Sequence, residues 1–181
     1  VGFIRIEDMT PKKGIAMKWM VGKAGCLNLR EALRKEWIET NDRGDYASSS
    51  IVNCHTRRYH GWLVANLEGT LGRHVLLSGV EEILCVGGRE FKLACHKYPG
   101  LFHPRGHEYQ ESAEGDGWPV FRYRIGDIRL TREILLLQKR STVLVRYAVE
   151  KAPVPIVLRL CPLLAFRRHH SLTRANVDIQ V

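Results

Sequence analysis

The fold is decided by one stretch of the sequence, VEEILCVGGREFKL at residues 80–93. Its first half, residues 80–86, is rich in apolar and β-branched side chains and is typical of a strand. Gly87 and Gly88 follow, and two adjacent glycines permit the positive φ angles of a two-residue hairpin turn. Phe91 and Leu93 then alternate with charged residues on the return strand. The stretch therefore predicts an antiparallel hairpin in which Val86 pairs with Arg89.

Short runs of the same kind fill most of the chain beyond residue 37. They lie at 61–67, 75–77, 121–125, 128–130, 143–149 and 156–160. Gly126-Asp127 and Pro153-x-Pro155 break the pattern between successive runs. Many short strands with period-two alternation, joined by Gly- and Pro-bearing turns, are typical of an antiparallel β-sandwich. We therefore expect a mainly β fold, with helix only near the N-terminus.

One short helix is predicted over residues 28–37. Asn28 can cap it, and Glu31 stands three residues on, where a capping box places its acid. Leu29, Leu33 and Trp37 follow at four-residue spacing and would share one face. The sequence thus predicts one short N-terminal helix with an apolar face.

Length and charge limit the classes of protein to consider. The 181 residues fit one domain. Lys and Arg number 28 against 19 Asp and Glu, a net charge of +9 that raises nucleic acid as a partner. The basic residues are spread along the chain without a stripe or motif, so a nucleic-acid-binding β-domain stays an alternative rather than the leading interpretation. No run approaches the ~20 apolar residues of a membrane helix and no signal peptide is visible, so we expect no membrane span and a cytoplasmic protein.

The five cysteines point to a reducing compartment. Their number is odd and none forms a CxxC pair. In the predicted hairpin Cys85 faces Glu90, and continuing the register places Cys95 opposite Val80, so the two sulfurs do not meet. We therefore expect free thiols.

Candidate binding residues gather in the segment 41–60, which is predicted to be rich in loops, and at the start of the strand after it. Two guanidiniums, a phenol, an imidazole and an indole follow one another closely; they belong to Arg57, Arg58, Tyr59, His60 and Trp62. Guanidinium N–H groups can donate to pairs of hydroxyls, and aromatic faces cover the C–H face of a sugar. The combination predicts a site for a polyhydroxylated ligand. The alternative is structural: Tyr59 and Trp62 are core aromatics, and the arginines pair with nearby acids.

A second loop segment, 95–111, offers Tyr98, His103 and Arg105 to the same ligand. His103 and His107 have the four-residue spacing of a helical metal site, but Pro104 and Gly106 disfavour a helix there and no third ligand is evident. We predict no metal. A third segment, 163–171, is either another loop at the same rim or a solvated connection.

The sequence lacks a recognisable catalytic centre. Glycoside hydrolysis needs two carboxyl groups across the scissile bond. Glu81 and Glu82 are adjacent on a predicted strand and point to opposite faces, while Glu111, Glu114 and Asp116 are expected to be solvated loop charges. No nucleophile elbow and no phosphate-binding glycine loop is present, so neither a catalytic role nor a cofactor is predicted.

These segments together resemble the N-terminal domain of bacterial and archaeal glycogen debranching enzymes of the amylo-α-1,6-glucosidase type. The resemblance spans about residues 36–175, and its most specific string is TRRYHG at 56–61. It also includes EWIETN at 36–41, GDYAS at 44–48, Asn53, GR at 72–73, VLLS at 75–78, YPG at 98–100, HPRG at 103–106, RLCPLLAFR at 159–167 and HSLT at 170–173.

The resemblance implies a β-sandwich of the glucoamylase-associated type that recognises α-glucan. It also implies that an (α/α)6-barrel elsewhere in the parent chain carries the acids that remove glucose from α-1,6 branch points. On this basis residues 1–26 are an unplaced extension and 27–181 the sandwich domain. The alternation of Val177, Ile179 and Val181 predicts that the sandwich continues past the last residue. A purely structural domain remains the other alternative.

Overall fold

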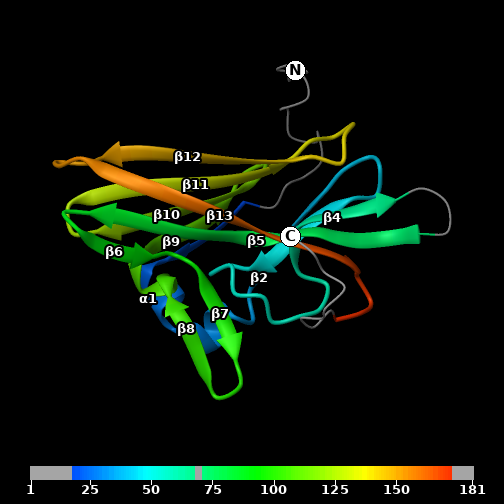
Figure 1. Cartoon of the computed structure of the whole chain (residues 1–181), viewed down its shortest axis with the longest axis horizontal. Coiled ribbons are helices and arrows are strands. Elements are labelled where there is room, and N and C mark those ends of the chain that lie inside the picture. Colours follow the sequence, from blue (N-terminus) through cyan, green and yellow to red (C-terminus); the bar gives the residue numbers. More distant parts are fainter. Residues whose placement is uncertain (1–17, 68–70, 173–181) are drawn as a thin grey trace.

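The structure, a computed structural model, describes residues 18–67 and 71–172 and consists of two antiparallel sheets and a separate hairpin. One sheet has the strand order β1-β9-β10-β11-β12, and the other has the order β13-β5-β4-β3-β2, with β6 beside β5 (Figure 1). The strands of the first sheet are β1 (Trp19–Gly22), β9 (Gln110–Gly115), β10 (Pro119–Ile125), β11 (Ile128–Leu136) and β12 (Val143–Lys151). Those of the second are β2 (Glu36–Thr40), β3 (Tyr46–Ser50), β4 (Gly61–Leu67), β5 (Gly72–Val86), β6 (Arg89–Lys92) and β13 (Ile156–Arg168). The hairpin consists of β7 (Cys95–Tyr98) and β8 (Leu101–Arg105).

The core lies between the two sheets. On β10 the alternating residues Phe121, Tyr123 and Ile125 are buried, as their pattern predicted. The Phe121 ring lies 6.0 Å from the ring of Trp37 in the opposite sheet. Face-to-face packing of two antiparallel sheets confirms the predicted β-sandwich. No helix in the described residues is long and apolar enough to cross a membrane.

The β5–β6 hairpin forms as the sequence predicted. Val86 pairs with Arg89 and Cys85 with Glu90. Gly87 and Gly88 have φ of 52° and 77°, the conformation that a two-residue turn of type I′ requires.

The prediction for Cys95 was wrong. The return strand ends at Lys92, and Cys95 belongs to β7, where it pairs with Arg105 of β8. The backbone N–H of Leu93 still bonds to the carbonyl of Glu82 on β5, at 2.9 Å, but the carbonyl of the next residue, Ala94, accepts the N–H of Gly106 instead. The chain therefore leaves β5 after Leu93. All five cysteines are free, in agreement with the prediction.

The predicted helix is shorter than expected and Trp37 is not part of it. Asn28 does cap a helix, since its Oδ1 accepts the N–H of Glu31, but α2 (Leu29–Ala32) ends after one turn. It follows a second short helix, α1 (Lys23–Leu27), which was not predicted from the sequence. Trp37 lies in β2, where its buried indole donates to the carbonyl of Ser50 at 3.2 Å. Pairing of β2 with β3 and burial of this ring outweigh the local helical spacing.

Strands also run through two segments that were predicted to be loops. β3 lies in the first of these segments. It was not predicted because three of its five residues, Ser48–Ser50, are polar, yet these serines are buried on a strand that lies between β2 and β4. The second contains β7, β8, the 3-10 helix η3 (Gly106–Tyr109) and the start of β9. Glu111 and Glu114 are therefore strand residues, paired with Lys23 and Arg122 rather than free in a loop.

The edge strands β12 and β13 are joined across the predicted proline break. β13 exposes several large apolar side chains, Val157, Leu160, Leu164 and Phe166. At the other end of the chain, residues 19–22 form β1, which pairs with β9 as an edge of the first sheet. Val177, Ile179 and Val181 lie outside the described residues.

Candidate functional site

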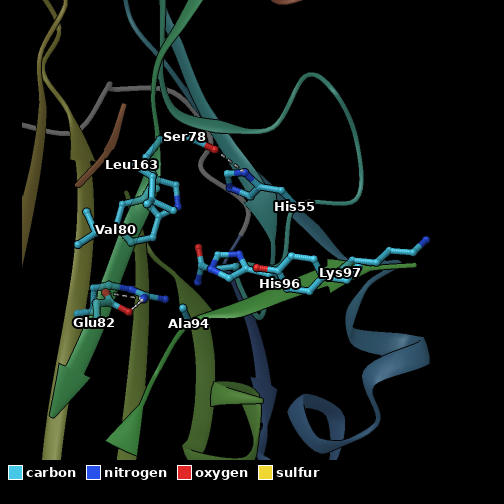
Figure 2. Close-up of a pocket in the computed structure, with 13 residues that line it drawn as sticks. His55, Ser78, Val80, Glu82, Ala94, His96, Lys97 and Leu163 are labelled. Carbon is cyan, nitrogen blue, oxygen red and sulfur yellow. Dashed lines mark hydrogen bonds and ion pairs between the residues drawn. The ribbon is translucent and has the colours of Figure 1, made fainter. Parts of the chain in front are cut away.

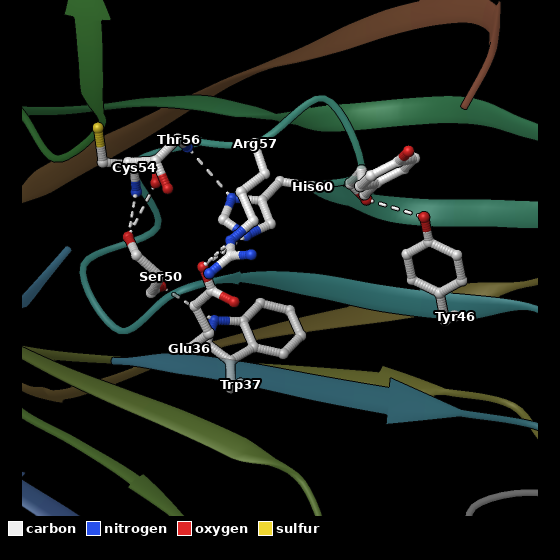
Figure 3. Close-up of polar contacts among 9 residues, drawn as sticks. Glu36, Trp37, Tyr46, Ser50, Cys54, Thr56, Arg57 and His60 are labelled. Atoms are coloured by element: carbon white, nitrogen blue, oxygen red, sulfur yellow. Dashed lines mark hydrogen bonds and ion pairs between the residues drawn. The ribbon is translucent and has the colours of Figure 1, made fainter. Parts of the chain in front are cut away.

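The residues of the most specific string lie in the compact loop 51–60 between β3 and β4 (Figure 3). At its start the Ser50 hydroxyl accepts the N–H of Cys54 at 3.0 Å and donates to the Cys54 carbonyl at 2.9 Å. At its end the N–H of Thr56 donates to Nδ1 of His60 at 3.2 Å. Hydrogen bonds inside the loop thus fix its shape, and the side chains of residues 57–59 are exposed to solvent.

Arg57 and His60 share one carboxylate. Nε of Arg57 lies 2.6 Å and Nε2 of His60 lies 3.4 Å from Oε1 of Glu36 (Figure 3). His60 is buried, whereas the Arg57 side chain is 65% exposed. Burial lowers the pKa of His60, and Arg57 adds to this while Glu36 opposes it. His60 is therefore a positioning residue of the loop. Arg57 is exposed to solvent while its Nε is held by the Glu36 carboxylate.

Arg58 and Tyr59 are tied to the end of β13. Arg58 donates to the carbonyl of His170 at 3.0 Å, and Arg167 donates to the carbonyl of Arg58 at 2.7 Å. The Tyr59 ring packs edge-on against His169 and His170, with centroid distances of 5.5 and 5.6 Å. The segment 163–171, predicted as either a further loop at the same rim or a solvated connection, is strand β13 up to Arg168, and His169 and His170 adjoin the loop.

A cavity of about 600 Å³ opens on this surface. We call it the outer cavity. Its lining consists of His55, Thr56, Arg57, Arg58, Tyr59, His60, Ser78, Arg167 and Leu172.

A second cavity, of about 560 Å³, adjoins the first and shares His55 and Ser78 with it. We call it the inner cavity. It lies between β5, β11 and the β7–β8 hairpin (Figure 2). It is lined by Asn53, His55, Trp62, Ser78, Gly79, Val80, Glu82, Ala94, His96, Lys97, Tyr98, Arg132 and Leu163.

A buried charged triad connects the two sheets beside the inner cavity. Nη1 of Arg132 lies 2.7 and 2.6 Å from the two carboxylate oxygens of Glu82, and the Tyr147 hydroxyl donates to Oε1 at 2.6 Å. The guanidinium also lies 5.0, 4.8 and 5.2 Å from the ring centroids of Trp62, Phe121 and Tyr123. Burial acts most strongly on the pKa of Arg132 and lowers it, but Glu82, Tyr123 and Tyr147 together outweigh burial and raise that pKa above its usual value.

The eight residues proposed from sequence do not all meet. Arg57, Arg58, Tyr59 and His60 line the outer cavity, while Trp62 and Tyr98 line the inner one. His103 and Arg105 are exposed on β8, outside the lining of both, and Arg105 pairs with Glu108 at 2.9 Å.

The sequence reading missed the polar residues deep in the inner cavity. Glu82 shares a strand face with Val80 and Leu84, and Arg132 shares one with Leu130 and Ile134. Each of these charged residues stands at a position where the alternation of its strand predicts a buried apolar residue, and the two charges are opposite in sign. That combination is a signal in the sequence that could have identified them. Asn53 offered no comparable signal, because its position depends on the loop.

His55, at the junction of the two cavities, gives a pH-dependent prediction. Burial, and secondarily His60, lowers its pKa to about 3. A histidine that is neutral when folded but titrates near 6.5 when unfolded contributes stability above pH 6.5, which is lost as the pH falls toward 3. We expect the free energy of unfolding to fall by about 2 kcal/mol more between pH 7 and pH 5 in the wild type than in His55→Gln. Urea denaturation at the two pH values measures this difference, and parallel losses in both proteins would contradict it.

The two adjacent acids of β5, Glu81 and Glu82, have different partners. Glu81 bonds to His96, whereas Glu82 is buried against Arg132, so the two carboxylates point apart as predicted. No cluster of three or more metal-ligating side chains occurs in residues 18–67 and 71–172. His103 is exposed on β8 and His107 is buried in η3.

Comparison with known proteins places the chain in one family. The family model described as "Glycogen debranching enzyme N terminal" matches residues 35–181. Among curated proteins and among solved structures, none matches the chain. The family match covers the whole of the loop, both cavities and every strand from β2 onward. The chain therefore belongs to the glycogen debranching enzyme N-terminal family, as its sequence resemblance implied.

Proposed function

We propose that this domain recognises α-glucan in a glycogen debranching enzyme and helps to shape the substrate cleft, while a barrel elsewhere in the parent chain hydrolyses the α-1,6 bond. The observation that carries the proposal is the outer cavity, where an exposed phenol and three guanidiniums adjoin a fixed loop. Tyr59 is 41% exposed and can cover the apolar face of a glucose ring. Arg57 and Arg58 lie beside it with N–H groups suited to pairs of sugar hydroxyls.

The rigidity of this surface also favours recognition. The bonds that join Arg58 and Arg167 to main-chain carbonyls tie the loop to β13, so little side-chain ordering remains to be done on binding. Sugar chains are flexible, and a surface that is fixed in advance binds them at lower entropic cost.

The exposed apolar side of β13 suits contact with the remainder of the enzyme. Val157, Leu164 and Phe166 are 59%, 63% and 69% exposed on a strand that ends at the outer cavity. Apolar patches of this kind mark interaction surfaces. A barrel packed here would bring its catalytic acids to the glucan held at residues 57–59. The free cysteines favour the cytoplasm as the place of action.

Replacing Arg58 by alanine tests the role of the outer cavity. We expect the affinity of the chain for maltoheptaose to fall about tenfold, the equivalent of one charge-assisted hydrogen bond. In the debranching enzyme that carries the domain, we expect branch-point hydrolysis to fall as well. Isothermal titration calorimetry and glucose release measure the two effects.

Arg124→Ala is the matched control, because Arg124 is also exposed and also donates to a main-chain carbonyl, that of Gly126. It should change neither quantity. If Arg58→Ala keeps its fold, its affinity and the branch-point hydrolysis, the loop is not part of the cleft.

Binding of an anion such as nucleic acid is the second candidate, favoured by the three guanidiniums of the outer cavity in a chain of net charge +9. Salt separates the two functions. Phosphate binding weakens steeply as salt is added, whereas binding of a neutral glucan hardly changes. Titration with maltoheptaose and with an oligonucleotide at 50 and 200 mM salt distinguishes them.

A further inference from the structure

Three residues that line the inner cavity carry buried polar atoms with no hydrogen-bond partner among the described residues. They are Nε and Nη2 of Arg132, Nε1 of Trp62, and both amide atoms of Asn53. Each belongs to a residue that lines the cavity. Arg132 and Trp62 are only 1% and 2% exposed, so bulk solvent does not reach these groups freely.

Such atoms are rare in native proteins and call for an explanation. An unsatisfied buried donor or acceptor costs about 1–3 kcal/mol. Five such atoms belong to residues that line one cavity, which favours a ligand of that cavity as their partner. Asn53 has a φ of 54°, a conformation that asparagine adopts more readily than most residues other than glycine.

The charges of the inner cavity select a neutral ligand. The guanidinium of Arg132 is matched by the carboxylate of Glu82, 2.6 Å away. His55 is neutral at physiological pH because its pKa is lowered to about 3, mainly by burial. His96 is bonded to Glu81. Lys97 remains, but it is exposed at the opening, where water solvates it.

The free groups are mainly donors, which selects for hydroxyl oxygens. Arg132 and Trp62 offer N–H groups, and Asn53 offers both a donor and an acceptor. A sugar hydroxyl accepts from such N–H groups and donates its own proton to an oxygen such as Oδ1 of Asn53. The volume of about 560 Å³ lies within the usual range for small-molecule pockets, about 300–1,000 Å³.

Gly79 leaves space beside the Trp62 indole. A Cβ at position 79 would approach only the Trp62 indole, at 3.9 Å from Nε1 and from Cε2. Neither a positive φ nor a close backbone contact requires glycine here, although glycine weakens the interior of a strand. A missing side chain beside an unpaired indole N–H is expected where a ligand approaches closely.

We propose that the inner cavity is a binding subsite for one neutral hexose ring, a glucosyl unit of the α-glucan, held by Asn53, Trp62 and Arg132. The proposal rests on the proposed function and extends it. The outer cavity would hold the following part of the glucan chain, since the two cavities share His55 and Ser78.

Gly79→Val tests the subsite because it fills the space in front of Trp62. The probes are glucose, maltose and inorganic phosphate, added to the whole chain labelled with nitrogen-15. We expect glucose and maltose to shift the indole N–H resonance of Trp62, which is assigned by its loss in Trp62→Phe. In Gly79→Val the shift should disappear and the affinity for glucose should fall at least tenfold, with a smaller loss in Gly79→Ala.

Gly22→Val is the matched control, since Gly22 is exposed, also has no positive φ, and its Cβ would meet nothing within 4 Å. It should leave the shift and the affinity unchanged. Thermal melting of each variant checks that the fold is retained; valine is favourable in a strand, so Gly79→Val should melt no lower than the wild type.

The outcomes separate this proposal from the one before it. If Arg58→Ala weakens maltoheptaose binding while glucose neither shifts Trp62 nor depends on Gly79, the inner subsite is wrong and the outer surface stands. If glucose shifts Trp62 but Arg58→Ala has no effect, the outer surface is wrong. If phosphate shifts the indole N–H resonance of Trp62 and glucose does not, the proposal that the ligand is neutral is wrong.

Discussion

Arg132→Met should lower the free energy of unfolding by about 3–5 kcal/mol, because it leaves the Glu82 carboxylate buried without its countercharge. Glu82 is 1% exposed, and its remaining bond is to the hydroxyl of Tyr147. Methionine nearly fills the volume but provides neither the charge nor the contact with the three aromatic rings. Urea denaturation at pH 7 measures the loss.

Two further variants make this prediction specific. Arg122→Met removes a similar ion pair, with Glu114 on the neighbouring strand, but the Arg122 side chain is 43% exposed, and such pairs contribute about 0–1 kcal/mol. Replacing the whole triad, as Glu82→Leu, Arg132→Met and Tyr147→Phe together, should recover most of the stability because no buried charge remains. If the single and triple variants are equally unstable, the cost lies in packing rather than in the unpaired carboxylate.

Trp62→Ala should also lower the free energy of unfolding by about 3–5 kcal/mol. The indole is 2% exposed and belongs to the core cluster, so its removal leaves a large void next to the inner cavity. Trp62→Phe keeps part of this contact and should cost less. Thermal or urea unfolding followed by circular dichroism gives the values.

Tyr98→Ala is the matched control, because Tyr98 lines the same cavity with a side chain that is 51% exposed. Its effect should stay within about 0.5 kcal/mol. Equal small losses in Trp62→Ala and Tyr98→Ala would place Trp62 at a binding rim, which is the role that sequence alone suggested for it, and not in the core.

Burial places Trp62 in the wall of the inner cavity and not at an exposed rim. Tryptophan and arginine serve both in cores and in binding sites, and their order along the chain does not distinguish the two. In this fold Trp62 is the second residue of β4, a central strand with sheet neighbours on both sides, β3 and β5. Tyr59, three residues earlier, is exposed because the loop turns it outward. The difference in burial between Tyr59 and Trp62 therefore depends on the point at which the exposed loop ends and the central strand β4 begins.

The same argument applies to the two basic segments. Arg58 and His170 are 112 positions apart, and the sequence could suggest only that both were polar. Antiparallel pairing of β13 with β5, which also pairs with β4, brings the end of β13 to the loop. His103 and Arg105 were also predicted to bind the ligand, but they lie on β8 of the β7–β8 hairpin and line neither cavity.

Local patterns were enough to predict the β-sandwich, the β5–β6 turn, the family and the loop that carries Arg57–His60, because each of these leaves a signal in residues that are close together along the chain. Three features became visible only in the folded chain: Trp37 lies in a strand, Glu82 meets Arg132 between the sheets, and residues with unpaired donors line one cavity. These features depend on contacts between distant segments, whose burial and pairing energies outweigh local preferences and leave little trace in local sequence spacing.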